Sequence, residues 1–359
     1  MLYFVSPYYK KSVYTGANKR FDELGQQMLR LLGKTFRIVV CEGERPYWAP
    51  SAMCLFVKPY GSKWERLQTF YLLRVLLSRL DPATVVSDFM PIPFSALSKH
   101  HHFQLIHDLR NFTKFKRGGM SVLTARFQKK QLIRSRNIIT VSEYSKHNLT
   151  RLCGIPENKI FVSYNGIGEK YLRSPAISEK DIDILYVATF EERKNHRRLM
   201  QALNLSDRGL KVRFIGQDLG TKAEIIQLAE NLIHEKGFQF EFITSLSEDQ
   251  LIHAYERTKV YAFPSLLEGF GMPLIEAIAL NCRVACSDLT VFREICGDYA
   301  EYFDARDPSS IWASIQTSLL NENTRDNDDF IKPYLWENIA VKLLQDLGCV
   351  DLRQSPSPT

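Results

Sequence analysis

No stretch of the sequence looks able to cross a membrane, because none reaches the roughly 18 consecutive apolar residues that a span requires. The first residues, Met1–Pro7, also lack the basic lead and the cleavage site of a signal peptide. Neither Gly-x-Gly-x-x-Gly nor a phosphate loop ending in Gly-Lys-Ser/Thr occurs, so a nicotinamide enzyme or a P-loop NTPase is not expected. The 7 cysteines are irregularly spaced, which favours buried thiols over a disulfide or metal framework. We therefore expect a cytoplasmic protein or one peripheral on a membrane.

The length of 359 residues suggests two domains. Charge is unevenly distributed between the two halves of the chain. Residues 1–173 hold 28 Lys and Arg against 11 Asp and Glu, whereas the remainder holds 19 against 29. The basic half would suit an anionic partner: acidic lipid headgroups, a lipid-linked pyrophosphate or nucleic acid. We favour a membrane surface over nucleic acid, because no nucleic-acid motif accompanies the basic residues. A mutual attraction of the two halves across a cleft stays open as an alternative.

Short apolar runs alternate with helical patterns in both halves, as is typical of parallel sheets covered on both faces. In the first half we expect strands at 2–5, 36–41, 84–87, 104–107 and 137–141, and helices at 19–32, 63–80 and 142–152. In the second half we expect strands at 182–187, 210–215, 238–242, 260–263 and 283–286, and helices at 195–204, 221–235, 247–257, 273–280, 290–295 and 335–347. The sequence thus predicts an α/β protein with two doubly wound domains, 1–170 and 171–330, and a disordered tail at 349–359. Such domains bind ligands at the carboxyl ends of their strands.

The strongest chemical signal is the segment Phe263–Ala277, in which a strand, a glycine-containing turn and a helix follow one another. Gly269 and Gly271 allow backbone amides to approach a ligand closely. The start of the helix gathers free N–H groups and partial positive charge, which suits a phosphate. Glu268 and Glu276 bracket the turn, and carboxylates accept hydrogen bonds from sugar hydroxyls. The pattern therefore predicts a sugar-phosphate site.

This segment resembles the E-x7-E signature of family 4 retaining glycosyltransferases of the GT-B class, and it matches their Glu-Gly-Phe-Gly-x-Pro-x-x-Glu-Ala pattern without a departure. The resemblance implies two Rossmann-like domains facing across a cleft. It implies that Glu276 binds the ribose of a nucleotide-sugar donor and that Glu268 lies near the transferred sugar. It also implies that the backbone around Phe270, Gly271 and Met272 holds the sugar and the diphosphate.

A second pattern, Leu185–Asn195, places two adjacent cations in the turn after a strand. Arg193 and Lys194 could neutralise a nucleoside diphosphate leaving group without a metal ion. The family usually has Val-Gly-Thr-Leu-Glu-Pro-Arg-Lys-Asn here, and its Arg and Lys contact the pyrophosphate. Ala188 and Glu192 depart from that form, which could alter the turn, but both cations are present.

The first half carries two weaker matches to the same family. His107 is the last residue of an expected strand, and the family's His at this place reaches the transferring sugar or its phosphate. Gly16 matches one glycine of the Gly-Gly pair that clears room for the diphosphate. Trp336-Glu337-Asn338 resembles the start of the family's C-terminal helix, so we expect residues 331–348 to cross back to the first domain.

No metal ion or other cofactor is expected. His100, His101 and His102 are consecutive, and three such side chains cannot all face one ion from an extended chain. Asp181-Ile182-Asp183 has the Asp-x-Asp spacing of metal-dependent GT-A transferases, but it opens an expected strand, and we interpret it as coincidental.

Two segments are candidates for contact with the membrane or the acceptor. Residues 63–80 predict a helix with its apolar residues, among them Trp64, mainly along one side. It could pack on the first sheet or lie in the membrane interface. The loop after His107 is basic and aromatic and could contact a lipid-pyrophosphate acceptor; its cations are Arg110, Lys114, Lys116 and Arg117.

Together these patterns predict a metal-independent retaining hexosyltransferase. Its donor would be a nucleotide-sugar such as GDP-mannose or a UDP-hexose, and its acceptor a lipid-linked or other growing glycan of a cell-surface polysaccharide, as in lipopolysaccharide or O-antigen biosynthesis. We expect it on the inner face of the cytoplasmic membrane, with an anionic surface and no nucleic acid as partner. Another GT-B nucleotide-sugar enzyme, such as a 2-epimerase, and a basic nucleic-acid-binding protein remain the alternatives.

Overall fold

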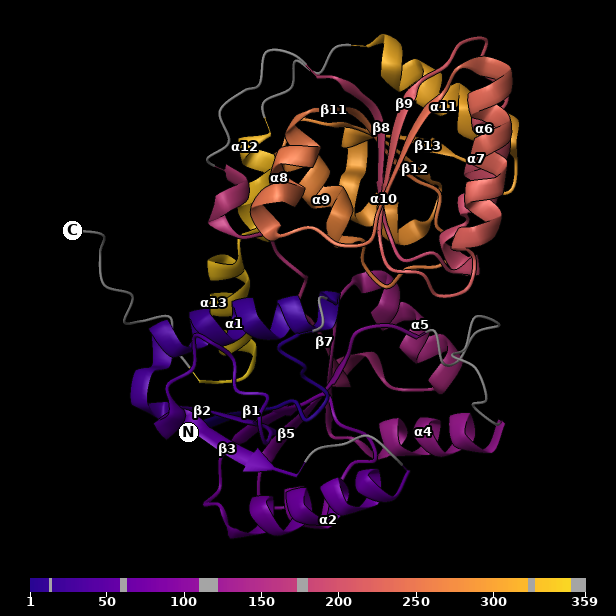
Figure 1. Cartoon of the computed structure of the whole chain (residues 1–359). Coiled ribbons are helices and arrows are strands. Elements are labelled where there is room, and N and C mark those ends of the chain that lie inside the picture. Colours follow the sequence, from indigo (N-terminus) through magenta and orange to yellow (C-terminus); the bar gives the residue numbers. More distant parts are fainter. Residues whose placement is uncertain (13–14, 59–62, 110–121, 173–179, 322–326, 350–359) are drawn as a thin grey trace, which may run out of the picture. The chain divides into compact units, whose positions relative to one another are not determined.

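The computed structural model describes residues 1–12, 15–58, 63–109, 122–172, 180–321 and 327–349. The chain forms two compact α/β units (Figure 1). The first, the N-terminal unit, consists of Met1–Gly166 together with the segment that begins at Leu335. The second, the C-terminal unit, is Ile167–Tyr334.

The N-terminal unit contains a seven-stranded sheet in the order β3-β2-β1-β4-β5-β6-β7, and every neighbouring pair is parallel. Its strands are β1 (Leu2–Val5), β2 (Phe36–Cys41), β3 (Cys54–Val57), β4 (Thr84–Ser87), β5 (His101–Ile106), β6 (Asn137–Thr140) and β7 (Ile160–Val162). Its α-helices are α1 (Gly16–Leu32), α2 (Lys63–Arg79), α3 (Phe94–Leu97), α4 (Val122–Arg134), α5 (Glu143–Cys153) and α13 (Trp336–Asp346). The strand order reverses between β1 and β4, and doubly wound sheets bind ligands at the carboxyl edge of such a point.

The C-terminal unit repeats this plan with six parallel strands in the order β10-β9-β8-β11-β12-β13. These are β8 (Ile182–Val187), β9 (Lys211–Ile215), β10 (Gln239–Ile243), β11 (Thr258–Phe263), β12 (Arg283–Ser287) and β13 (Ala300–Phe303). The α-helices are α6 (His196–Leu203), α7 (Lys222–Lys236), α8 (Glu248–Glu256), α9 (Met272–Ala279), α10 (Thr290–Cys296), α11 (Pro308–Leu320) and α12 (Asp328–Ile331). Here the order reverses between β8 and β11, the two strands whose following loops carry the predicted cations and Glu268.

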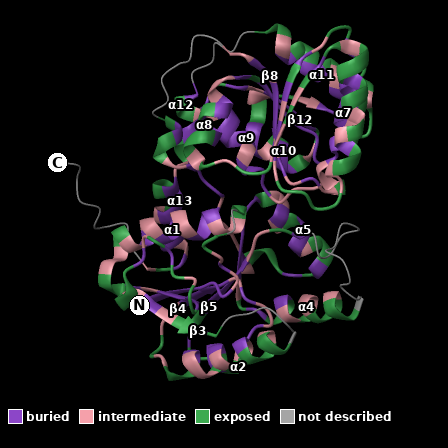
Figure 2. Ribbon diagram, viewed as in Figure 1, coloured by how far each residue is buried: buried purple, intermediate pink, exposed green. Residues whose placement is uncertain are grey.

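Burial follows the apolar runs of the sequence. Most strands form the buried interior of each unit, although the edge strand β10 has no buried residue, and most helices bury one face and expose the other (Figure 2). In β1 all four residues are buried, and β11 exposes only Lys259. This is the pattern of strands covered on both faces, which is why they read as continuous hydrophobic stretches.

Helix α13 belongs to the N-terminal unit although it follows the whole C-terminal unit in sequence. It packs on α1, and its first residue, Trp336, is among the largest fully buried side chains of the chain. An ion pair of 3.7 Å between Arg30 and Glu337 joins the same two helices at the surface. The expectation that this helix returns to the first domain is confirmed.

The structure confirms the expected strands within two or three residues and adds, in the described part of the chain, seven strands and α-helices that the sequence did not predict. These are the strands β3, β7 and β13 and the helices α3, α4, α11 and α12. Strands β3, β7 and β13 lie at sheet edges and are short or partly exposed, so no long apolar run marks them. Helix α11 has many Ser and Thr residues, which weaken a helical pattern, but Asp307 caps it and Pro308 occupies its first turn.

The prediction that the apolar residues of 63–80 lie mainly along one side is wrong. Leu73 and Leu77 of α2 are buried against the sheet. Trp64, Leu67 and Tyr71 follow one another at helical spacing on another face and are 82%, 58% and 62% exposed. The helix therefore has two apolar faces, and only one of them is used by the fold.

Candidate active site

The predicted cations and one predicted acid meet beyond the carboxyl ends of β8 and β11. Arg193 and Lys194 lie in a 3-10 turn, Glu192–Lys194, that follows β8. Lys194 Nζ lies 2.6 Å from Glu268 Oε1, and Arg193 Nη1 lies 3.3 Å from Glu268 Oε2. One carboxylate thus bridges two cations, and all three side chains are largely buried.

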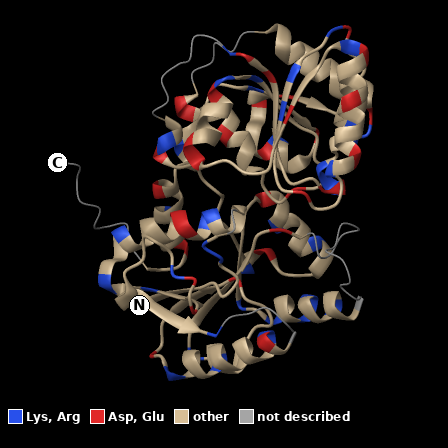
Figure 3. Ribbon diagram, viewed as in Figure 1, with Lys and Arg blue, Asp and Glu red and all other residues tan. Residues whose placement is uncertain are grey.

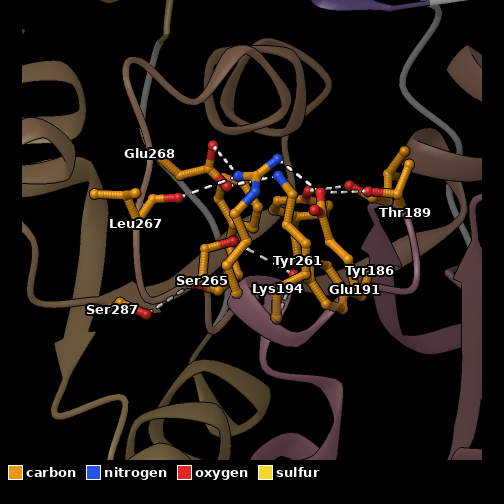
Figure 4. A network of polar contacts seen from close by, with 12 residues as sticks. Tyr186, Thr189, Glu191, Lys194, Tyr261, Ser265, Leu267, Glu268 and Ser287 are labelled. Atoms are coloured by element: carbon orange, nitrogen blue, oxygen red, sulfur yellow. Dashed lines mark hydrogen bonds and ion pairs between the residues drawn. The ribbon is translucent and has the colours of Figure 1, made fainter. Parts of the chain in front are cut away.

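Arg193 is held from a second side by Glu191, a residue that the sequence had not singled out. Figure 4 labels Glu191 beside Thr189. Arg193 Nη2 donates to Glu191 Oε1 over 2.8 Å, and Thr189 Oγ1 donates to the same oxygen over 3.0 Å. Arg193 Nη1 also donates to the carbonyl of Leu267 over 3.2 Å. These bonds fix the plane of the guanidinium, which is the property that lets Arg clamp an anion in one orientation.

The backbone of the cationic turn is tied to the loop after β11. The amide of Leu266 donates to the carbonyl of Arg193, and the Tyr186 hydroxyl donates to the carbonyl of Lys194 over 2.7 Å. Asn195 adopts a left-handed conformation with φ 62°, which Asn tolerates better than most residues. Its side chain donates to the carbonyls of Pro264 and Ala305. The two loops are therefore preorganised relative to one another.

Glu268, the acid of the cluster, is ionised at neutral pH. Burial alone would raise the pKa of Glu268, but Lys194 and Arg193 outweigh it, so the pKa of this carboxyl lies below its usual range. Two cations face two carboxylates, Glu268 and Glu191, in the ligand-free protein. A bound diphosphate would bring the negative charge that Glu268 now supplies, leaving Glu268 free to contact a sugar.

The turn before α9 is built for backbone contacts. Gly271 precedes the helix with φ +107°, and a Cβ there would lie 3.0 Å from Leu274 and Phe292. The neighbouring side chains of Phe270 and Met272 are buried, so what this turn offers a ligand is its backbone. Helix α9 begins at Met272, one residue before the expected start.

Glu276, the second predicted acid, lies one turn inside α9 and is only 4% exposed. The Tyr255 hydroxyl of α8 donates to Glu276 Oε2 over 3.2 Å. Tyr255 is another contact that the sequence had not singled out. The E-x7-E spacing places both acids on the same strand–turn–helix unit but in different surroundings: Glu268 is paired with cations, and Glu276 with a phenol.

In the N-terminal unit, His107 follows β5 directly and is half-buried. Burial, and then the nearby Arg20, lower the pKa of His107 to about 3, so its imidazole is neutral at physiological pH. It can act as a hydrogen-bonding group but not as a cation. Gly16 is the first residue of α1, whose N-cap Thr15 accepts a hydrogen bond from the amide of Asn18.

Arg20, one turn inside α1, is a third residue that the sequence had not marked. Its guanidinium is buried and donates to Ser163 Oγ, the Tyr164 carbonyl and Asn165 Oδ1 over 2.7 to 2.9 Å. Burial lowers the pKa of Arg20 to about 9. It fastens α1 to the segment Ser163–Asn165.

Asp88 lies at the reversal point of the N-terminal sheet, directly after β4. Ser6, directly after β1, donates to Asp88 Oδ2 over 2.6 Å, while Asp88 Oδ1 is buried without a hydrogen-bond partner. Burial raises the pKa of Asp88 to about 7. A carboxyl in this condition costs stability when it is ionised.

Three of the residues considered as metal ligands, Asp181, Asp183 and His100, have other partners. Asp181 pairs with Arg257, and Asp183 lies 2.7 Å from Lys259 Nζ. His100 Nε2 lies 2.9 Å from the Leu77 carbonyl, and His101, the first residue of β5, is exposed. Across the described ranges, no group of three or more His, Cys, Asp or Glu side chains is arranged to hold a metal ion. All seven cysteines are free, and six of them are buried, as expected.

The candidates for membrane or acceptor contact lie partly inside and partly outside the described residues. Trp64 stands on the exposed face of α2. Arg110, Lys114, Lys116 and Arg117 lie outside the described residues. In the part of the chain that is described, no helix has the length and hydropathy needed to cross a bilayer.

Two Rossmann-like units, one of which presents an Arg-Lys-Glu cluster beside a glycine turn and a helix start, define a GT-B-class protein. The match to known families is specific: residues 14–170 match the family described as Glycosyltransferase Family 4, and residues 168–331 match Glycosyl transferases group 1. The chain belongs to the group 1, family 4 glycosyltransferases, a family of retaining, metal-independent hexosyltransferases.

Among curated proteins, the chain is similar to O-antigen chain mannosyltransferase B of Escherichia coli, with 27% identity over 226 residues, 58% of this chain and 59% of that protein. It is also similar to O-antigen chain mannosyltransferase RfbU of Salmonella typhimurium, with 26% identity over 210 residues and 58% of each chain. The chain thus spans less than two thirds of the length of these relatives.

Solved structures show the fold. The lipopolysaccharide outer core galactosyltransferase WaaB has a TM-score of 0.71 at 16% identity, covering 96% of this chain and 98% of that one. Sucrose-phosphate synthase of Thermosynechococcus elongatus has a TM-score of 0.75 at 16% identity, covering 96% and 97%. At such identities the likeness concerns the architecture alone, and it agrees with the predicted GT-B fold.

Proposed function

We propose that this chain transfers a hexose from a nucleotide-sugar, with retention of configuration, to a growing lipid-linked glycan of a cell-surface polysaccharide. The observation that carries the proposal is the bridged cluster of Arg193, Lys194 and Glu268 beside the Gly271 turn. Two fixed cations and a helix start suit a diphosphate, and a carboxylate at their side suits the sugar attached to it.

The proposed chemistry needs little from the protein beyond electrostatics. The bond between the anomeric carbon and the diphosphate oxygen breaks through an oxocarbenium-like state, and the acceptor oxygen bonds to the same face of the ring. The acceptor proton passes to an oxygen of the departing diphosphate, whose charge Arg193 and Lys194 stabilise. Glu276 binds the ribose hydroxyls, and His107 is assigned to the transferred sugar by family resemblance alone. Being neutral, it would serve there as a hydrogen-bonding group.

The donor is proposed as GDP-mannose or a UDP-hexose. The relatives named as O-antigen mannosyltransferases favour the first. A thermal-shift screen against GDP-, UDP-, dTDP- and ADP-sugars in the presence of EDTA tests this. Stabilisation by one nucleotide class without metal is expected, and it should disappear in Lys194→Ala. If no class stabilises the wild type, the proposed function is wrong.

We further propose that the N-terminal unit contacts the inner face of the cytoplasmic membrane, where a lipid-linked acceptor would lie. Support comes from the exposed face of α2 formed by Trp64, Leu67 and Tyr71. Helix α4 adds exposed Leu123 and Phe127 and carries four Lys and Arg residues without an acid (Figure 3). Aromatic and basic side chains on one unit are typical of an interfacial surface.

Vesicle flotation tests this membrane proposal. We expect binding to vesicles that contain phosphatidylglycerol, weak binding to phosphatidylcholine alone, and loss of binding in a Trp64→Ala, Leu67→Ala, Tyr71→Ala variant. A matched control replaces three exposed apolar residues of the C-terminal unit, Leu205, Leu219 and Ile233, with Ala. Equal flotation of both triple variants and the wild type would contradict the proposal.

A further inference from the structure

A buried phenol lies against the predicted ribose-binding acid. Tyr255 is fully buried, and its hydroxyl donates to Glu276 Oε2 over 3.2 Å. Glu276 is itself only 4% exposed, so the rotamer of its carboxylate is fixed by the protein rather than by solvent. Tyr255 is too deeply buried to touch a ligand, and any effect it has on binding must pass through Glu276.

Tyr255 is held rigidly on its own side. It lies in the last turn of α8, which starts with a reciprocal capping box between Ser247 and Gln250. Its backbone carbonyl accepts from Cys282 Sγ over 3.1 Å. Burial, and then the neighbouring Tyr261 and Glu276, raise the pKa of Tyr255 well above its ordinary value, so the phenol remains a donor.

We propose that Tyr255 is a positioning residue for Glu276: its hydroxyl occupies one carboxylate oxygen and orients the group toward the two ribose hydroxyls of the donor nucleotide. The inference rests on the proposed function, because it takes Glu276 to be the ribose ligand. A carboxylate free to rotate could accept hydrogen bonds from the hydroxyls too, but it would lose rotamer freedom when it did so.

The chain contains a matched control for this proposal. Tyr261 of β11 is also fully buried, and its ring lies 5.5 Å from that of Tyr255. Its hydroxyl, however, donates to the backbone carbonyl of Val187 over 3.4 Å. Tyr255→Phe and Tyr261→Phe therefore remove the same atom from the same aromatic cluster, and only the first removes the hydrogen bond to Glu276.

The experiment is isothermal titration of the wild type and both variants with UDP and GDP and with their 2′-deoxy counterparts, in EDTA. For whichever base binds, we expect Tyr255→Phe to weaken the ribonucleotide about three- to tenfold. The 2′-deoxynucleotide should change much less, so the preference for ribose shrinks. Tyr261→Phe should leave that preference at the wild-type value. In a Glu276→Gln background, Tyr255→Phe should have no further effect on it.

The outcomes separate the inference from the function on which it rests. If Tyr255→Phe weakens ribo- and deoxynucleotide equally, or weakens neither, Tyr255 is structural and the inference is wrong while the proposed function stands. The same conclusion follows if Tyr261→Phe reduces the ribose preference as much. If neither UDP nor GDP binds the wild type, the proposed function and the inference both fall. Thermal unfolding of each variant without ligand checks that it folds.

Discussion

Replacing Glu268 with Gln should separate the binding of a diphosphate from the transfer of a sugar. In the ligand-free protein, Glu268 bridges Lys194 at 2.6 Å and Arg193 at 3.3 Å. A nucleoside diphosphate must compete with this carboxylate for the two cations, or bind beside its negative charge. The amide of Gln keeps the size of the side chain and removes the charge. Counterintuitively, the variant should bind UDP or GDP more tightly than the wild type.

The size of the effect follows from the burial of the cluster. Two unit charges about 4 Å apart interact by about 4 kcal/mol at an effective dielectric constant near 20. Lys194, Arg193 and Glu268 are 11 to 15% exposed, so screening by solvent is limited. Part of this energy offsets the desolvation of the pair, and we expect a net gain on the order of 1 to 2 kcal/mol for the diphosphate. That corresponds to roughly five- to thirtyfold in Kd.

Two measurements on one variant test the argument. Titration calorimetry with UDP and GDP in EDTA gives the affinity, and transfer from the nucleotide-sugar gives the activity. Transfer should fall by about a hundredfold or more, because the proposed contact of the Glu268 carboxylate with the sugar is lost. Glu192→Gln serves as the control, since Glu192 lies in the same turn but is exposed. Unchanged or weaker nucleotide binding in Glu268→Gln would refute the reasoning.

Three further predictions concern stability. Gly271→Ala should destabilise the protein more than Gly220→Ala in thermal unfolding. Both glycines have φ near +110°, but only a Cβ added at position 271 would lie 3.0 Å from neighbouring atoms. Equal losses of stability would mean that packing around Gly271 is unimportant. Asp88→Asn should stabilise the protein increasingly as pH rises from 5 to 8, by up to about 3 kcal/mol. The native pKa of about 7 exceeds the unfolded value, so the wild type binds more protons when folded and loses stability over that window. His196→Phe should change stability with pH in the opposite direction. Burial lowers the pKa of His196 to about 3, below its unfolded value, so the wild type becomes more stable by about 2 kcal/mol between pH 5 and 8. The variant lacks this increase in stability. Denaturant unfolding at both pH values measures each difference, and a pH-independent effect would contradict either assignment.

The architecture could be predicted well from the sequence, because buried parallel strands are visible as short runs of apolar residues. Strands β1, β2, β4 and β8 have the expected bounds, since each is an apolar run ended by polar residues. Strand β13 was not predicted, because its exposed Glu301 and partly exposed Tyr302 interrupt the run of apolar residues. The two apolar faces of α2 could not be separated either, because apolar residues on two faces of a helix give no single period that marks the buried face.

The residues of the candidate site likewise fall into those that the sequence predicted and those that it did not. The residues that belong to one local segment, such as Glu268 and Gly271, were found from their spacing. The residues that orient them come from distant segments: Tyr255 precedes Glu276 by 21 positions, and Arg20 meets Asn165 across 145. Glu191 was close to Arg193 in sequence, but nothing in its type distinguished it from the exposed Glu192. Such partners become visible only once the fold has brought them together.

The placement of α13 has a consequence for how the molecule is made. During synthesis, every residue of the C-terminal unit leaves the ribosome before Trp336 does. The seven strands of the N-terminal sheet are all synthesised in the first half of translation, long before α13. Until α13 arrives, the surface of α1 that it covers remains exposed, and the large indole of Trp336 is missing from the interior. The unit that begins first is therefore completed last.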